Sequence, residues 1–193
     1  EDTTCVFTLE AKPELVEQYG FTMEFKYPVV KEAFDSLIFR SVNPRQQEAF
    51  GKYTVTQDSL NLRKYTIMPE DKLQAGWEYF LKVPHRRFTD INGFYNDSTE
   101  VKVSLPSDDK LSSLYLVLTG VEAKYIVDLL NEKRDNVIRS FIVDKDQTLL
   151  FPYLKTGKYA IRFTEDKNGN GLVDTGNLLE HRQPEKVKFY RLE

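Results

Sequence analysis

The residues best suited to bind a ligand are grouped in one short segment, between residues 166 and 177. Asp166, Asn168 and Asn170 alternate with other residues, and Gly171 follows at once. This D-x-N-x-N-G pattern is typical of calcium-binding loops, in which alternate oxygen-bearing side chains surround one hard cation and the glycine permits a sharp turn. The segment therefore predicts a cation site, with Ca²⁺ as the expected ion.

The second part of this segment departs from the pattern. The backbone carbonyl of Leu172 and the side chain of Asp174 are expected to supply the next ligands, and Asn177 stands at the twelfth position. An EF-hand loop has a bidentate glutamate at that position, so we expect a weaker affinity for Ca²⁺ here. A metal-free turn is the alternative, because Asn-Gly pairs such as Asn168-Gly169 are also typical of tight hairpins.

Residues suited to catalysis are few. His85 and His181 are the only histidines, and neither belongs to an H-x-x-x-H metal-binding pair or lies near a nucleophile motif. The single cysteine, Cys5, excludes an internal disulfide and a cysteine-based zinc cluster. Cys5 also lies in a segment of alternating apolar residues, which predicts a position in the core. We therefore expect a protein that is not an enzyme.

The charge distribution excludes a nucleic-acid-binding role. Residues 1–105 carry 13 Lys and Arg against 16 Asp and Glu, a net charge of −3, whereas residues 106–193 carry 14 of each and are neutral. Neither half has the basic excess that binding to a phosphate backbone requires. No run of 18 apolar residues is present, so the sequence also predicts no membrane-spanning helix.

The chain that positions the 166–177 segment has the pattern of an all-β protein. Apolar and polar residues alternate in many short segments, which is typical of strands with one buried face. These segments are 21–27, 77–83, 101–105, 114–118, 125–129 and 159–163. One short helix is expected at residues 43–51, with Asn43 as its N-cap, Pro44 as its first residue and Gly51 as its end.

The alternation stops at the polar segment 106–110 and begins again after it. This interruption predicts a linker between two tandem β-sandwich domains, residues 1–105 and residues 106–193. One continuous sandwich is the alternative.

Short motifs in each half resemble known families. Residues 21–29, 73–79 and 88–93 are similar to the F-x-x-P-V, L-x-x-G-x-x-Y and F-x-D-x-x-G segments of bacterial Ig-like domains. Residues 154–159, 166–176 and 183–185 resemble transthyretin-like domains and the B-type repeats of surface proteins. The whole chain thus resembles an Ig-like lipoprotein of the bacterial cell envelope.

The resemblance implies a role and a location for the protein. It implies export to the periplasm or cell surface, with a lipid anchor in the precursor. It also implies calcium bound by Asp166, Asn168, Asn170 and Asp174, although the replacement at Asn177 departs from the repeats. We expect a monomeric, non-catalytic structural or adhesion-type module whose partner is a protein or glycan at the cell surface.

A carbohydrate-binding module is the alternative function. It would need exposed aromatic side chains aligned on one face, and the chain holds one Trp, 11 Tyr and 13 Phe. The alternation of Trp77 with Tyr79, Leu81 and Val83 predicts that Trp77 belongs to the core instead.

Overall fold

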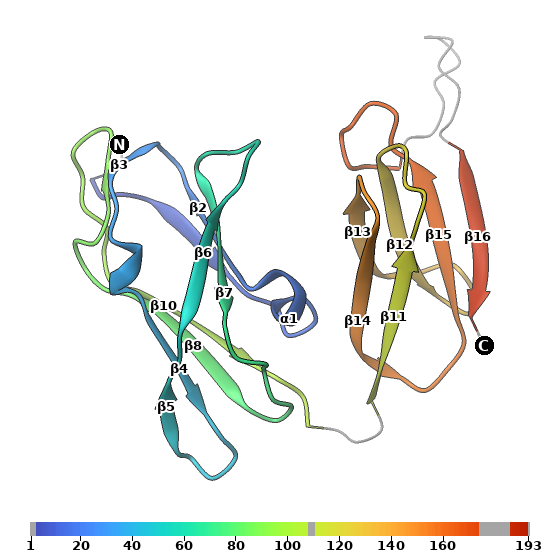
Figure 1. Cartoon of the computed structure of the whole chain (residues 1–193), viewed down its shortest axis with the longest axis horizontal. Coiled ribbons are helices and arrows are strands. Elements are labelled where there is room, and N and C mark those ends of the chain that lie inside the picture. The colour runs from blue at the N-terminus through green and yellow to red at the C-terminus, as the bar shows by residue number, and fades with distance from the viewer. Residues whose placement is uncertain (1–2, 108–110, 174–185, 193) are drawn as a thin grey trace. The chain divides into compact units, whose positions relative to one another are not determined.

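The computed structural model describes residues 3–107, 111–173 and 186–192. For residues 190–192 it describes the backbone only. Its helical elements are the four-residue helix α1 (Val16–Tyr19) and a 3-10 turn (Phe34–Ser36), and the rest of its regular structure is antiparallel β-sheet (Figure 1). The all-β fold class is therefore confirmed. Within the described ranges no helix has the length and apolar character needed to cross a membrane.

The chain divides into two compact units, Glu1–Asp108 and Asp109–Glu193. We call them the first and the second unit. The division falls inside the segment 106–110 that the sequence singles out as a linker.

The first unit is built from two four-stranded sheets and a two-stranded ribbon. One sheet has the strand order β1-β2-β7-β6, the other β10-β8-β4-β5, and the ribbon pairs β3 with β9. In chain order the strands are β1 (Phe7–Glu10), β2 (Phe21–Phe25), β3 (Val29–Lys31), β4 (Ile38–Val42), β5 (Glu48–Phe50), β6 (Tyr53–Gln57), β7 (Lys64–Pro69), β8 (Glu78–Val83), β9 (Thr89–Asp90) and β10 (Thr99–Ser104).

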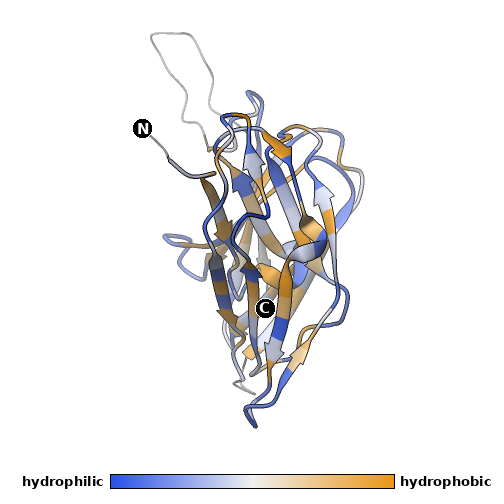
Figure 2. Cartoon of the chain, turned by 90° about the vertical axis from the view of Figure 1, so that its left-hand side faces the viewer, coloured by the Kyte–Doolittle hydropathy of each residue, from blue (hydrophilic) through white to orange (hydrophobic). Residues whose placement is uncertain are grey.

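The core of the first unit follows the predicted alternation. Phe21, Met23 and Phe25 of β2 are buried, and the residues between them are partly exposed. Figure 2 shows apolar and polar residues alternating along these strands. The ring of Phe21 lies 6.0 Å from the ring of Phe39 on β4, so the two sheets pack face to face.

The second unit pairs a four-stranded sheet with a sheet of only two strands. The larger sheet has the order β13-β12-β15-β16, and the smaller sheet pairs β11 with β14. The rings of Phe141 on β13 and Phe151 on β14 lie 5.0 Å apart and join the two sheets. In chain order the strands are β11 (Leu111–Leu118), β12 (Tyr125–Asn131), β13 (Val137–Val143), β14 (Gln147–Lys155), β15 (Tyr159–Glu165) and β16 (Val187–Leu192).

The predicted helix at residues 43–51 is wrong. Asn43 does act as a cap, but its Oδ1 accepts the backbone N–H groups of Arg45 and Gln47 at 2.9 and 3.0 Å in a tight turn. Gln46 adopts a left-handed conformation, with φ of 62°. The chain then returns as β5, which pairs with β4. A side chain that caps helices also closes turns, and here the neighbouring strand decides the outcome.

The position of Trp77 also differs from the prediction. Trp77 lies just before β8 and is half-buried rather than part of the core, whereas Tyr79, Leu81 and Val83 are buried as expected. Tyr27 lies beyond the end of β2 and is half-buried. Alternation therefore located the strands but not their ends: β2 and β8 are shorter than predicted, whereas β11, β12 and β15 are longer.

Candidate cation-binding loop

The predicted ligands Asp166, Asn168 and Asn170 lie in the loop that follows β15. Asp166 is 4% exposed, and its backbone N–H donates to the carbonyl of Lys124 at 2.9 Å. The N–H of Gly171 donates to Asp166 Oδ2 at 2.9 Å and closes the loop. Gly171 has φ of 73°, and a Cβ atom there would lie 2.8 Å from Ile142 Cδ1. The turn at this position therefore requires glycine.

The two asparagines hold the loop by local hydrogen bonds. Asn168 Oδ1 accepts the N–H of Asn170 at 3.0 Å, and Asn170 Oδ1 accepts the N–H of Leu172 at 2.8 Å. Amide carbonyl oxygens are also among the ligands that hard cations accept. The loop thus presents one carboxylate and two amide oxygens within a few residues.

Lys124 is a member of the site that the sequence pattern missed. Its Nζ donates to the carbonyl oxygen of Gly169 at 3.0 Å and lies 3.8 Å from Asp166 Oδ2. The ammonium group partly compensates the charge of the buried carboxylate. These contacts also describe a metal-free turn held closed by Lys124, which is the alternative the sequence left open.

The second carboxylate oxygen distinguishes the two possibilities. Asp166 Oδ1 is buried and has no hydrogen-bond partner in the described part of the chain. A buried carboxylate oxygen without a partner is unfavourable, and an oxygen-seeking cation would satisfy it. The residues present therefore fit a hard cation, although the single described carboxylate predicts low affinity.

The remaining predicted ligands are placed only in part. The side chain of Leu172 is exposed, whereas Asp174 and Asn177 lie outside the described residues. The described ranges contain no group of three or more His, Cys, Asp and Glu side chains able to hold a metal ion. Among the described residues, the oxygens beside Asp166 that could bind a cation are amide and backbone oxygens.

The histidines and Trp77 form no comparable site in the described structure. His85 is exposed, and its Nδ1 lies 3.7 Å from Asp97 Oδ1, beyond hydrogen-bonding distance. His181 lies outside the described residues. Trp77 packs one face on the buried Tyr79, with a ring separation of 6.4 Å and an interplanar angle of 19°.

Asn96 is a buried polar residue that the sequence analysis did not identify. Its side chain is fully buried and makes four hydrogen bonds with the backbone of the first unit. Although Asn96-Asp97-Ser98 matches a glycosylation sequon, the burial of Asn96 makes this asparagine a framework residue of the folded unit.

Cys5 is buried, as predicted, and we expect it to react slowly in the folded protein. Burial, followed by the negative charge of Asp90, raises the pKa of its thiol from 9.0 to about 11. Since the thiolate is the nucleophile, this shift alone lowers the alkylation rate at about pH 8 by about 100-fold. Iodoacetamide labelling followed by mass spectrometry, in native buffer and in urea, measures the ratio. Equal rates in both would contradict the burial of the thiol.

Comparisons with known proteins give no family. No family model matches the sequence, and no curated protein does. The chain is similar in structure to a pullulanase from Anoxybacillus sp. LM18-11, solved alone and complexed with maltotriose. Both likenesses have a TM-score of 0.24, 9% sequence identity and cover 82% of this chain. The chain spans about a quarter (24%) of the length of these structures, and so low a TM-score defines neither its fold family nor its function.

Proposed function

We propose that the chain is a non-catalytic structural or adhesion-type module of a bacterial cell envelope, and that Ca²⁺ bound at residues 166–172 stabilises its second unit. The buried Asp166 Oδ1, which has no partner among the described residues, is the observation that carries the cation. The motifs similar to bacterial Ig-like and transthyretin-like domains support the envelope location and export with a lipid anchor.

The proposed role of the cation is to order the loop. A metal that binds the native loop and not the unfolded chain stabilises the second unit by mass action. Lys124 Nζ, 3.8 Å from Asp166 Oδ2, is the group that Ca²⁺ would displace or repel. Binding would therefore place a divalent ion beside Asp166 in exchange for the ammonium of Lys124, whose side chain is 40% exposed and would turn further toward solvent.

Calcium is expected to raise the melting temperature of the second unit. For a dissociation constant of about 1 mM, about 10 mM Ca²⁺ adds roughly 1.4 kcal/mol to the free energy of unfolding. This corresponds to about 5–10 °C for a unit of this size. Circular dichroism melting of the full chain, with Ca²⁺, with Mg²⁺ or with chelator, measures the shift. Fluorescence of Trp77, the single tryptophan, reports the first unit and should not respond.

Two variants test whether the shift arises at this loop. Asp166→Asn removes the only described carboxylate and is expected to abolish the shift. Lys124→Met removes the competing ammonium and is expected to enlarge it, because a like charge 3.8 Å from the carboxylate no longer opposes the ion. An unchanged melting curve for the wild-type chain and for Lys124→Met would eliminate the cation and leave the turn closed by Lys124.

A further inference from the structure

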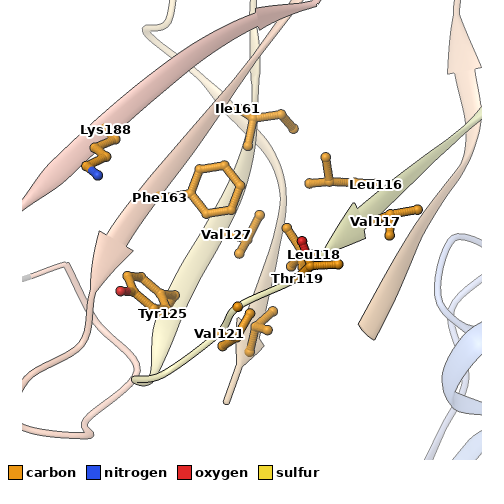
Figure 3. A pocket seen from close by; sticks show the side chains of 12 residues that line it. Leu116, Val117, Leu118, Thr119, Val121, Tyr125, Val127, Ile161, Phe163 and Lys188 are labelled. Atoms are coloured by element: carbon orange, nitrogen blue, oxygen red, sulfur yellow. The ribbon is translucent and has the colours of Figure 1, made fainter. Parts of the chain in front are cut away.

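The second unit has an apolar groove where its smaller sheet ends. Phe151 of β14 packs on Phe141 of β13, so the two-stranded sheet packs against the half of the four-stranded sheet that begins with β13. Phe163 of β15 is half-buried and Lys188 of β16 is exposed, and both line the groove beside the two-stranded sheet. The resulting groove has a volume of about 500 Å³ and is lined mainly by apolar side chains. Figure 3 shows Leu116 and Leu118 of β11 on one side and Phe163 of β15 and Lys188 of β16 on the other.

One wall of this groove is the edge of a strand. Among the described residues β11 pairs only with β14, so its opposite edge presents backbone N–H and C=O groups toward the groove. The sequence of β11, LSSLYLVL, contains none of the charged residues, prolines or glycines that usually block an edge strand. By contrast, the other strand of this sheet, β14, carries Pro152 and the left-handed Tyr153, with φ of 59°. Only the edge that faces the groove is suited to accept another strand.

We propose that this groove binds an extended segment of another polypeptide, which adds as a strand beside β11. The backbone of the segment would satisfy the edge of β11, and its alternate side chains would contact the half-buried apolar residues Leu116, Leu118 and Phe163. Among the described residues, Lys188 is the only charged residue that lines the groove. An acidic side chain in the segment would therefore form an ion pair with Lys188. We expect Lys188 to make the groove prefer acidic segments.

The strand arrangement disfavours a second copy of the chain as the occupant. The larger sheet continues from β12 by two more strands, β15 and β16, on the side away from β13. If β11 of a second copy paired with β11 of the first, its own β12 would have to occupy the position of β15. A single extended segment avoids this overlap.

Peptide selection on the full chain tests the proposal. One displayed library of nine-residue peptides has Val, Ile, Leu or Phe at alternate positions, and a matched library has the same residues in one block. We expect enrichment from the alternating library alone, with acidic residues selected, and loss of that enrichment on Leu118→Glu. Circular dichroism confirms that this variant is folded. Equal enrichment from both libraries, or none from either, would overturn the proposal.

Backbone chemistry then separates strand addition from simple apolar binding. A selected peptide with N-methyl groups on the amides of one edge is expected to bind at least about ten-fold more weakly in fluorescence anisotropy, because it cannot pair with β11. Lys188→Glu is expected to weaken the binding of the acidic peptide and to strengthen the binding of its Glu→Lys counterpart. Equal affinity of the methylated and unmethylated peptides would refute strand addition. A dimer detected by light scattering and abolished by Leu118→Glu would identify a second copy as the occupant instead.

Discussion

Replacing Asp128 with alanine is expected to lower the free energy of unfolding of the second unit by about 3–5 kcal/mol. Asp128 lies on β12, and its side chain is 3% exposed. Arg162 of β15 donates from Nε and Nη2 to Asp128 Oδ2 at 2.9 and 2.6 Å. Ser140 of β13 donates to Oδ1 at 2.6 Å. The carboxylate thus joins three neighbouring strands in one row.

The large effect comes from the groups that the substitution leaves behind. Loss of the carboxylate removes the partner of Arg162 and of the Ser140 hydroxyl, and it opens a gap beside the buried Ile126 and Leu130. Removing one member of a buried ion pair is much more harmful than replacing both with apolar residues. The double variant Asp128→Leu/Arg162→Met is therefore expected to be more stable than Asp128→Ala.

Urea unfolding of the full chain, followed by circular dichroism, measures this loss. Trp77 lies in the first unit and is the only tryptophan, so its fluorescence transition is an internal control that should keep its midpoint. Ser140→Ala is a matched variant that removes one hydrogen bond and should cost about 1 kcal/mol. A loss below about 1 kcal/mol for Asp128→Ala would show that the ion pair contributes little.

The position of Asp128 shows where prediction from the sequence ended. Alternation at 125–129 correctly predicts a strand with Val127 and Leu129 buried. It assigns the opposite face to solvent, yet Ile126, Asp128 and Leu130 on that face are buried too. The partners of Asp128 are 12 and 34 residues away in the chain, and only the pairing register of β12 with β13 and β15 brings them opposite it. The alternation of apolar and polar residues in one sequence does not predict that register.

The candidate loop was predictable to a similar extent. Local spacing identified Asp166, Asn168, Asn170 and Gly171, because all their hydrogen bonds to one another join residues at most five apart. Lys124 was not predicted as part of the site, because it lies 45 residues from its partner Gly169 in the sequence. The groove beside β11 was not predicted either, because it too depends on contacts between distant parts of the chain. It depends on the unequal sizes of the two sheets, which follow from strand order and not from the alternation within any strand.

Replacing Asn96 with alanine is expected to destabilise the first unit by about 2–5 kcal/mol. The side chain of Asn96 is fully buried, and its Oδ1 accepts the backbone N–H groups of Arg87 and Phe88, each at 2.8 Å. Its Nδ2 donates to the carbonyl oxygens of Pro84 and Asp97 at 2.9 and 2.8 Å. Alanine removes the partner of four backbone groups, and each of them that stays buried and unsatisfied costs about 1–3 kcal/mol.

The midpoint of Trp77 fluorescence in urea measures this effect in the unit that contains Asn96. Asn96→Asp keeps the shape and both acceptor contacts but removes the two donated hydrogen bonds, so its charged oxygen would face the carbonyls of Pro84 and Asp97. We expect it to be at least as harmful as alanine, because buried charge without a partner is more costly than a cavity. Asn92→Ala is the matched control, since Asn92 is exposed in the neighbouring turn and its loss should change stability by less than about 0.5 kcal/mol. Similar losses at positions 92 and 96 would mean that the hydrogen bonds of Asn96 do not hold the segment between β8 and β10 in place.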